Sequence, residues 1–170
     1  MDITIRKALP EDASDYTACH ISCWQSAYKG IVTDEYLESM LVKKEQIIEH
    51  YKKALTDPGD CEYYCVIYES KMIGWIIINK SLGKDNAYIG EIWAVYLTQK
   101  FWGKGHGRVM LDFAVNELKF AKCARIFLWV FEANERARQF YEKHNFSFSG
   151  EKRKVTRYGS PLVQLKYVLT

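Results

Sequence analysis

Three glycines at alternate positions in the segment FWGKGHGRV, Gly103, Gly105 and Gly107, constrain this chain more than any other feature. Glycine destabilises a helix or strand by about 0.5–1 kcal/mol relative to alanine, so three in five residues indicate a function for the main chain. Residues 88–97 before them have the apolar pattern of a strand, and residues 105–121 after them have a helical one. The pattern predicts a strand, a loop and a helix, in which the loop either binds a phosphate or forms only a tight turn.

Two common phosphate-binding loops do not fit the spacing of these glycines. A P-loop requires GxxxxGK followed by Ser or Thr, and GKGHGRV has neither that spacing nor that ending. A dinucleotide fingerprint requires GxGxxG, whereas the third glycine here comes one residue early. Glu117 and Glu132 lie near the position of the acidic residue of that fingerprint, but they do not correct the glycine spacing.

Composition and charge indicate one globular domain spanning residues 1–170. The chain is 48% hydrophobic and 26% charged, and its net charge of +3 does not indicate a nucleic-acid partner. Residues 1–15 mix both charge signs, which excludes the apolar centre of a signal peptide. The longest apolar run, 126–131, is too short to span a bilayer. We therefore expect a cytoplasmic protein without a membrane partner.

The five cysteines do not have metal-ligand spacing. Cys19 and Cys23, like Cys61 and Cys65, are four residues apart, and only His20 lies nearby as a further ligand. This spacing predicts buried free thiols in a reducing compartment and no metal site.

Periodicity and turn signals divide the chain into strands and helices. The predicted elements are a strand at 3–8, a helix at 11–29 ended by Gly30, a helix from Thr33 or Asp34 to the turn DPGD at 57–60, a hairpin at 62–69 and 72–79, a loop at 81–86, a strand at 88–97, a helix at 105–121, a strand at 124–132, a helix at 134–145, and strands around 146–153 and 162–169. This order predicts an α+β (mixed α/β) fold of about seven strands and four helices. Its sheet is mostly antiparallel, with one parallel βαβ crossover.

From Glu91 to Phe146 the sequence resembles the GNAT superfamily of acyl-CoA-dependent N-acetyltransferases. EIWAVYLTQKFWGKGHGRVML is similar to the family's strand, loop and helix for coenzyme A, in which L-Y-V-x-P precedes [QR]-G-x-G-x-G/A. VFEANERARQFYEKHNF resembles the family's N-x-x-A-x-x-x-Y-x-K-x-G-F, with matches at Asn134, Ala137, Tyr141, Lys143 and Phe146. SCWQSAYKGIV, residues 22–32, is similar to the W-x-x-A-Y-x-G first helix of one branch.

The resemblance implies the GNAT fold and acetyl-CoA as co-substrate. The pyrophosphate would bind the loop and the positive end of the following helix, at Trp102, Gly103, Lys104, Gly105, His106, Gly107 and Arg108. Lys143 would lie near the 3′-phosphate, and Asn134 would either bind the pantetheine or cap the last helix. The resemblance also implies that the strand at 88–97 diverges from the strand at 124–132, so that pantetheine pairs with the freed edge.

Three positions depart from the family pattern. Gln99 replaces the usual proline, and Asn145 replaces the glycine before Phe146, a change that asparagine's tolerance of the left-handed conformation makes benign. Trp102 stands where the family has Gln or Arg. We expect that change to weaken coenzyme A binding without abolishing it, because main-chain N–H groups make most contacts.

The family's chemistry assigns further roles. An acceptor amine attacks the thioester directly, and the amides of Val95, Tyr96 and Leu97 are expected to stabilise the oxyanion. Tyr141 is either the general acid for the leaving thiolate or a core tyrosine. Glu91 is either the base that deprotonates the amine or a solvated strand-edge carboxylate, and Trp93 and Val95 are expected to follow it on the same face.

Trp24 and Tyr28 lie four residues apart on the predicted first helix, so they share one side of it. They either line a pocket for the acceptor amine or pack in the core. The predicted function is acetyl transfer to a primary amine of a small molecule, such as a polyamine or amino compound. The alternatives are a protein or peptide acceptor and a non-catalytic module that binds acyl-CoA. Dimers are common in this family, so the resemblance also allows a homodimer.

Overall fold

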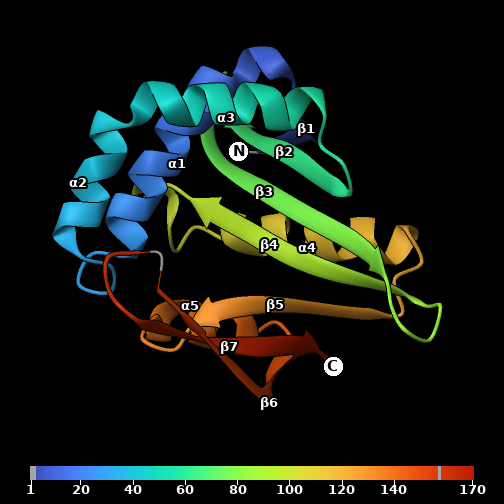
Figure 1. The fold of residues 1–170 in the computed structure, drawn as a ribbon. Coiled ribbons are helices and arrows are strands. Elements are labelled where there is room, and N and C mark those ends of the chain that lie inside the picture. The colour runs from blue at the N-terminus through green and yellow to red at the C-terminus, as the bar shows by residue number, and fades with distance from the viewer. Residues whose placement is uncertain (1–2, 157) are drawn as a thin grey trace.

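A seven-stranded sheet forms the centre of the protein in a computed structural model, which describes residues 3–156 and 158–170 (Figure 1). Its strands are β1 (Thr4–Lys7), β2 (Cys61–Tyr68), β3 (Lys71–Leu82), β4 (Tyr88–Leu97), β5 (Arg125–Phe131), β6 (Phe146–Val155) and β7 (Leu162–Leu169). Their order across the sheet is β1-β2-β3-β4-β5-β7-β6. Of the neighbouring strands in the described part of the chain, β4 and β5 alone pair in parallel, and the others are antiparallel. The mixed sheet with one βαβ crossover is therefore confirmed.

Among residues 3–156 and 158–170, five α-helices cover the two faces of the sheet. They are α1 (Ala13–Ala27), α2 (Asp34–Val42), α3 (Lys44–Thr56), α4 (His106–Phe120) and α5 (Glu135–Glu142). Helices α1 to α3 cover one face and enclose a core that includes Tyr16, Leu37 and Trp75. Helix α4 covers the other face, where Met110 and Leu118 pack against the sheet.

The predicted second helix is in fact two helices, α2 and α3, which are separated by Lys43 at φ −88° and ψ 12°. Thr33 caps α2 as expected, because its side-chain oxygen accepts a hydrogen bond from the N–H of Tyr36 at 3.3 Å. Apolar spacing did not show the break, because each half is amphipathic by itself. The turn at Lys43 brings the buried side chains of both helices, Leu37 of α2 and Tyr51 of α3 among them, to one core.

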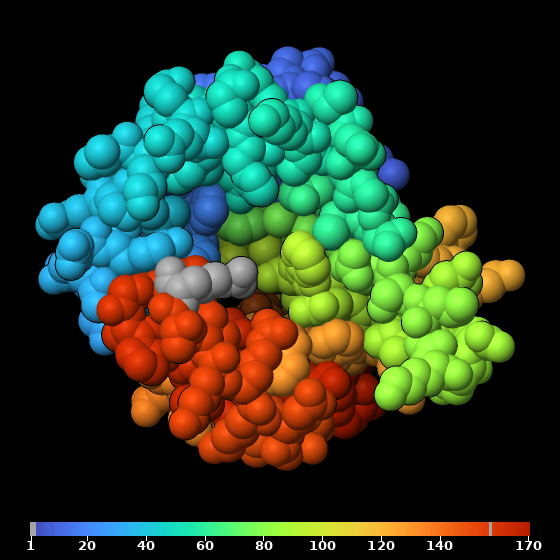
Figure 2. Space-filling view, in the orientation of Figure 1, coloured from blue at the N-terminus to red at the C-terminus, as the bar shows by residue number. Residues whose placement is uncertain are grey.

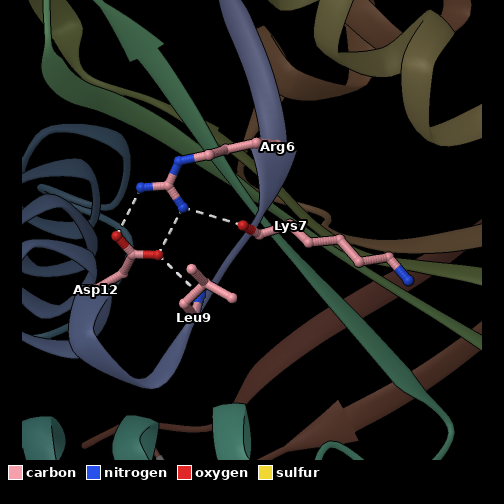
Figure 3. Close-up of polar contacts among 4 residues, drawn as sticks. All are labelled: Arg6, Lys7, Leu9 and Asp12. Carbon is pink, nitrogen blue, oxygen red and sulfur yellow. Dashed lines mark hydrogen bonds and ion pairs between the residues drawn. The ribbon is translucent and has the colours of Figure 1, made fainter.

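A polar contact ties β1 to the start of α1 (Figure 3). The guanidinium of Arg6 donates to both carboxylate oxygens of Asp12, each at 2.7 Å. The N–H of Leu9 donates to the same carboxylate at 2.8 Å. The hydrogen bonds from Arg6 are the main cause that lowers the pKa of Asp12 below its ordinary value. This contact fixes where α1 begins beside the sheet.

Strand β4 contains a bulge that decides how its side chains face. Ile77 of β3 pairs with Ala94 and Ile78 pairs with Ile92, which leaves Trp93 as the extra residue. Beyond the bulge, Ala94 packs on the α1 side of the sheet, whereas Val95 packs on the α4 side. The expectation that Val95 continues the face of Glu91 is therefore wrong, because a bulge interrupts the alternation of a strand.

Other sequence expectations have mixed outcomes. Strand β3 runs to Leu82, so the loop predicted from residue 81 begins two residues later. Cys19, Cys23 and Cys65 are buried free thiols, whereas Cys61 and Cys123 are only partly buried. Within residues 3–156 and 158–170, no cluster of three or more His, Cys, Asp or Glu side chains has an arrangement suited to a metal ion. No helix in the same residues is long and apolar enough to cross a membrane.

Candidate active site

The candidate site is a cleft of about 650 Å³ between the carboxyl-terminal halves of β4 and β5. The two strands pair only from Ile89 with Arg125 to Ile92 with Leu128, and then diverge as the family resemblance implied. The cleft is lined by Ala27, Tyr28, residues 92–97, Trp102, Gly103, Gly105, Gly107, Arg108, Trp129, Val130, Asn134, Arg136, Ala137, Gln139, Phe140, Tyr141, Lys143 and His144. Divergence of a parallel pair therefore opens the sheet at its centre.

The main chain of β4 offers donors to the cleft at alternate residues. The N–H of Thr98 donates to the carbonyl of Ile73 on β3 at 2.8 Å. Because backbone groups alternate along a strand, the N–H of Tyr96 also points to β3, while those of Val95 and Leu97 point into the cleft. Of the three amides expected at the oxyanion, two face the cleft. Tyr96 lines the cleft with its side chain and not with its amide.

The glycine loop has a backbone that only glycine adopts easily. Gly103 has φ 71° and Gly105 has φ 84°, and Gly105 is the N-cap of α4. The first N–H groups of α4 have no acceptor within the helix, so they and the helix dipole form a positive end at the cleft. Gly107 differs from these two, because its φ is not positive and a Cβ there would make only an ordinary contact with the ring of Phe140 at 3.5 Å.

The cations predicted near the phosphates divide into two groups. Arg108 and Lys143 line the cleft. The ammonium of Lys104 lies instead over the ring of Phe101, 5.4 Å from its centre, and the ring of His106 lies 6.0 Å from the same ring. Neither Lys104 nor His106 is among the residues that line the cleft.

Trp102 makes two contacts that its sequence position did not predict. Its indole Nε1 donates to the carbonyl of Leu97 at 2.6 Å, which occupies part of the free edge of β4. The guanidinium of Arg136 lies 3.3 Å from the centre of its ring. Sequence analysis missed Arg136, although it lies between two matched motif positions, Asn134 and Ala137.

Asn134 serves as the N-cap of α5, because its side-chain oxygen accepts a hydrogen bond from the N–H of Ala137 at 3.1 Å. It also lines the cleft, so capping does not exclude a contact with a ligand. After the helix, Asn145 has φ 64°, which confirms that it adopts the left-handed conformation expected of the usual glycine.

Tyr141 lines the cleft from α5. Burial raises the pKa of its phenol to about 12, although the nearby Arg136 guanidinium lowers it. The phenol is therefore protonated at neutral pH. The ring of Tyr141 also packs 6.0 Å from that of Phe146, so the residue has a structural contact as well as a polar group in the cleft.

Glu91 lies before the divergence of the strands and is not part of the cleft lining. A side chain at its neighbour Gly90 would meet Leu118 of α4, so Glu91 points to the opposite face of the sheet. Burial is the main cause that raises the pKa of Glu91, and Trp93, Arg153 and Lys166 oppose the shift. The groups that act on the pKa of Glu91 are therefore different from Arg136, which acts on the pKa of Tyr141.

The two predicted acceptor residues have different positions. Tyr28 lines the cleft, and its hydroxyl is hydrogen-bonded to that of Tyr96. Trp24 is 9% exposed and does not line the cleft. Its ring lies 4.8 Å from the ring of Tyr28 and 5.2 Å from that of Tyr158. Trp24 therefore packs behind Tyr28 and Tyr96, whose rings form an aromatic wall of the cleft.

Figure 2 shows a hollow on one face of the molecule, over the central strands of the sheet. The face of the molecule is hollowed between the blue and cyan helices α1 to α3 and the red and orange β6–β7 pair, with β3 and β4 at the bottom. The hollow lies on the face of the sheet opposite α4, which is the face of Glu91. Strand β4 therefore borders both the cleft and the hollow.

Comparison with known proteins gives the family. The family model described as Acetyltransferase (GNAT) family matches residues 21–146. The spermine/spermidine N(1)-acetyltransferase of Bacillus subtilis (strain 168) is 32% identical over 133 residues, which cover 71% of this chain and 87% of that protein. The uncharacterized N-acetyltransferase YuaI of the same strain is 26% identical over 176 residues and 98% of each chain.

The fold has a similar counterpart among solved structures. The crystal structure of PaiA N-acetyltransferase from Thermoplasma acidophilum in complex with coenzyme A has a TM-score of 0.73 and 24% sequence identity, and the match covers 98% of both chains. The diverging strands and the glycine loop agree with the family match, so the chain belongs to the GNAT family and is an acyl-CoA-dependent N-acetyltransferase.

Proposed function

We propose that this acetyltransferase acts on a primary amine of a small molecule, and that the acceptor is a polyamine. The observation that carries the proposal is one cleft that joins a positive helix end, two backbone donors, a protonated tyrosine and an aromatic wall. The Bacillus subtilis relative, by its name an acetyltransferase of spermine and spermidine, supports the choice of acceptor.

Coenzyme A fits the cleft by charge and by backbone. Its pyrophosphate would lie at the N-terminus of α4, where Gly103 and Gly105 leave the main chain uncovered, and Arg108 and Lys143 add positive charge. Its pantetheine arm would follow the edge of β4 at Val95, because the carbonyl of Leu97 already accepts from Trp102.

Acetyl-CoA supplies an acyl group as a thioester. The N–H groups of Val95 and Leu97 would stabilise the negative charge that develops on the carbonyl oxygen during attack. The phenol of Tyr141, with a pKa of about 12, would give its proton to the leaving sulfur. A partly buried group that lines the cleft and is protonated at neutral pH suits this role.

The amine must lose a proton before it attacks, because a free amine of pKa about 10 is almost fully protonated at neutral pH. Glu91 would accept this proton from the amine through the hollow on its face of the sheet. Burial raises the pKa of Glu91, which makes it more basic than an ordinary carboxylate. Tyr28 and Tyr96 would hold the nitrogen by their hydroxyls. The buried rings of Trp24 and Tyr158 pack against each other behind Tyr28 and keep its ring in place.

Thiol release from acetyl-CoA tests the proposal with spermidine, spermine, an N-terminal peptide and a lysine peptide as acceptors. We expect saturable release with the two polyamines and none above background with the peptides. Release with peptides alone would replace the proposal by a protein acetyltransferase. Tight coenzyme A binding without release on any acceptor would replace it by a non-catalytic module.

A further inference from the structure

Arg136 presents a cation to the cleft without a carboxylate to neutralise it. It is the second residue of α5, its side chain is exposed and lines the cleft, and partial desolvation lowers the pKa of its guanidinium. No ion pair joins it to an acidic side chain in the part of the chain that the structure describes. A guanidinium that lines a cleft without a counterion is available to bind an anion by charge-assisted hydrogen bonds.

Trp102 determines where this charge lies. Its indole is fixed to β4 by the hydrogen bond from Nε1 to the carbonyl of Leu97, 2.6 Å long. The guanidinium of Arg136 lies 3.3 Å from the centre of the ring, within the range of a cation–π contact. Because Trp102 directly precedes Gly103, the side chain from α5 is held at the head of the glycine loop.

Other groups that line the cleft are also positive. The N-terminus of α4 contributes its dipole, and Arg108 and Lys143 line the same space. Arg108 has an acidic neighbour, since its Nε lies 3.5 Å from the carboxylate of Asp112. Arg136 is therefore a lining cation with its charge uncompensated, and it lies beside the glycines.

We infer that Arg136, positioned by Trp102, binds the diphosphate of coenzyme A in place of the Gln or Arg that GNAT proteins usually have at the head of this loop. Trp102 then does not weaken the site, as its sequence position suggested, but brings a charge to it from another helix. The inference rests on the use of coenzyme A and is independent of the acceptor.

Calorimetric titration of the protein with coenzyme A tests the role of Arg136 without any catalysis. A charge-assisted bond to phosphate predicts that Arg136→Ala weakens binding about ten-fold or more, whereas Arg136→Lys loses less because it keeps the charge. Arg138→Gln is the matched control on the same helix, because Arg138 bonds to Tyr167 and to the carbonyl of Glu132 instead of lining the cleft. Coenzyme A affinity of Arg136→Ala within about two-fold of wild type overturns the inference.

A double-mutant cycle tests the role of Trp102. If Trp102 positions Arg136, Trp102→Ala weakens coenzyme A binding, and adding Arg136→Ala costs much less than in the wild type. In Trp102→Arg, which has the family's usual charge, Arg136→Ala also costs little. Fully additive losses would overturn the positioning role.

Dephospho-coenzyme A identifies the phosphate involved. It lacks the 3′-phosphate and keeps the diphosphate, so the loss caused by Arg136→Ala is expected to be the same with this ligand. A loss that disappears with dephospho-coenzyme A would overturn the diphosphate assignment in favour of the 3′-phosphate. Because no acceptor is present in these titrations, failure of the polyamine proposal would leave their result unchanged.

Discussion

The hydroxyl of Tyr28 at the end of α1 is hydrogen-bonded to the hydroxyl of Tyr96 on β4, although the two residues are 68 positions apart in the sequence. Both line the cleft, and the ring of Trp75 stacks on Tyr96 with 4.6 Å between ring centres. Burial is the main cause that raises the pKa of both phenols. The pair therefore presents neutral hydroxyls, which can hold an amine but cannot act as a base at neutral pH.

Removing either hydroxyl is expected to impair use of the acceptor and not of coenzyme A. Tyr28→Phe and Tyr96→Phe each delete one hydrogen-bonding group and keep the ring, so kcat/KM for spermidine should fall about ten-fold. Tyr88→Phe, at the exposed start of the same strand, is the control. Steady-state kinetics with unchanged kcat/KM in both variants would exclude the pair from acceptor binding.

Tyr141→Phe is expected to lower kcat about ten-fold or more, because the leaving thiolate loses its proton donor. Coenzyme A affinity, measured by calorimetry, should stay close to the wild-type value, since the ring and its packing remain. With a pKa of about 12, Tyr141 should cause no alkaline loss of activity up to about pH 10. Wild-type turnover in Tyr141→Phe would remove the residue from the mechanism.

Glu91→Gln is expected to lower activity and raise stability at neutral pH. Because the pKa of Glu91 is raised in the folded protein, folding favours the protonated form, and that contribution is lost as the pH rises through the raised value. A neutral amide avoids the cost of the buried charge, so thermal denaturation should occur at a higher Tm. In the pH–rate profile, the variant should lack the acidic limb that belongs to Glu91. A variant that keeps both rate and profile would leave Glu91 with no catalytic role.

His20 predicts how stability falls in acid. Burial is the main cause that lowers its pKa to about 4, and its Nδ1 lies 2.9 Å from the hydroxyl of Tyr51. The unfolded chain takes up this proton near pH 6.5 and the folded protein only near 4, so stability is complete above about 6.5 and is lost as the pH falls between the two values.

Denaturant unfolding across this pH window, in wild type and in His20→Gln, measures the contribution. The variant should lose less stability than the wild type, by up to about 3.4 kcal/mol at 1.36 kcal/mol per pKa unit. Equal losses in the two proteins would show that another group controls the acid transition.

Local sequence determined the elements of this protein. The glycine spacing, the periods of 2 and 3.6 residues and the caps predicted β4, α4 and α5, because these signals act between residues close in the chain. The motif matches also identified the family. Four residues that the sequence predicted at the coenzyme A site line the cleft in the structure: Arg108, Asn134, Tyr141 and Lys143.

The bulge at Trp93, the break at Lys43, and the pairings of Arg136 with Trp102 and of Tyr28 with Tyr96 were decided by tertiary structure alone. Each depends on contacts between segments that are distant in the sequence, where the packing of one element fixes the side chains of another. A single chain carries no local signal for such contacts. The sequence alone therefore determined the family and its use of coenzyme A, and the packing of α1, β4 and α5 decided which side chains line the cleft.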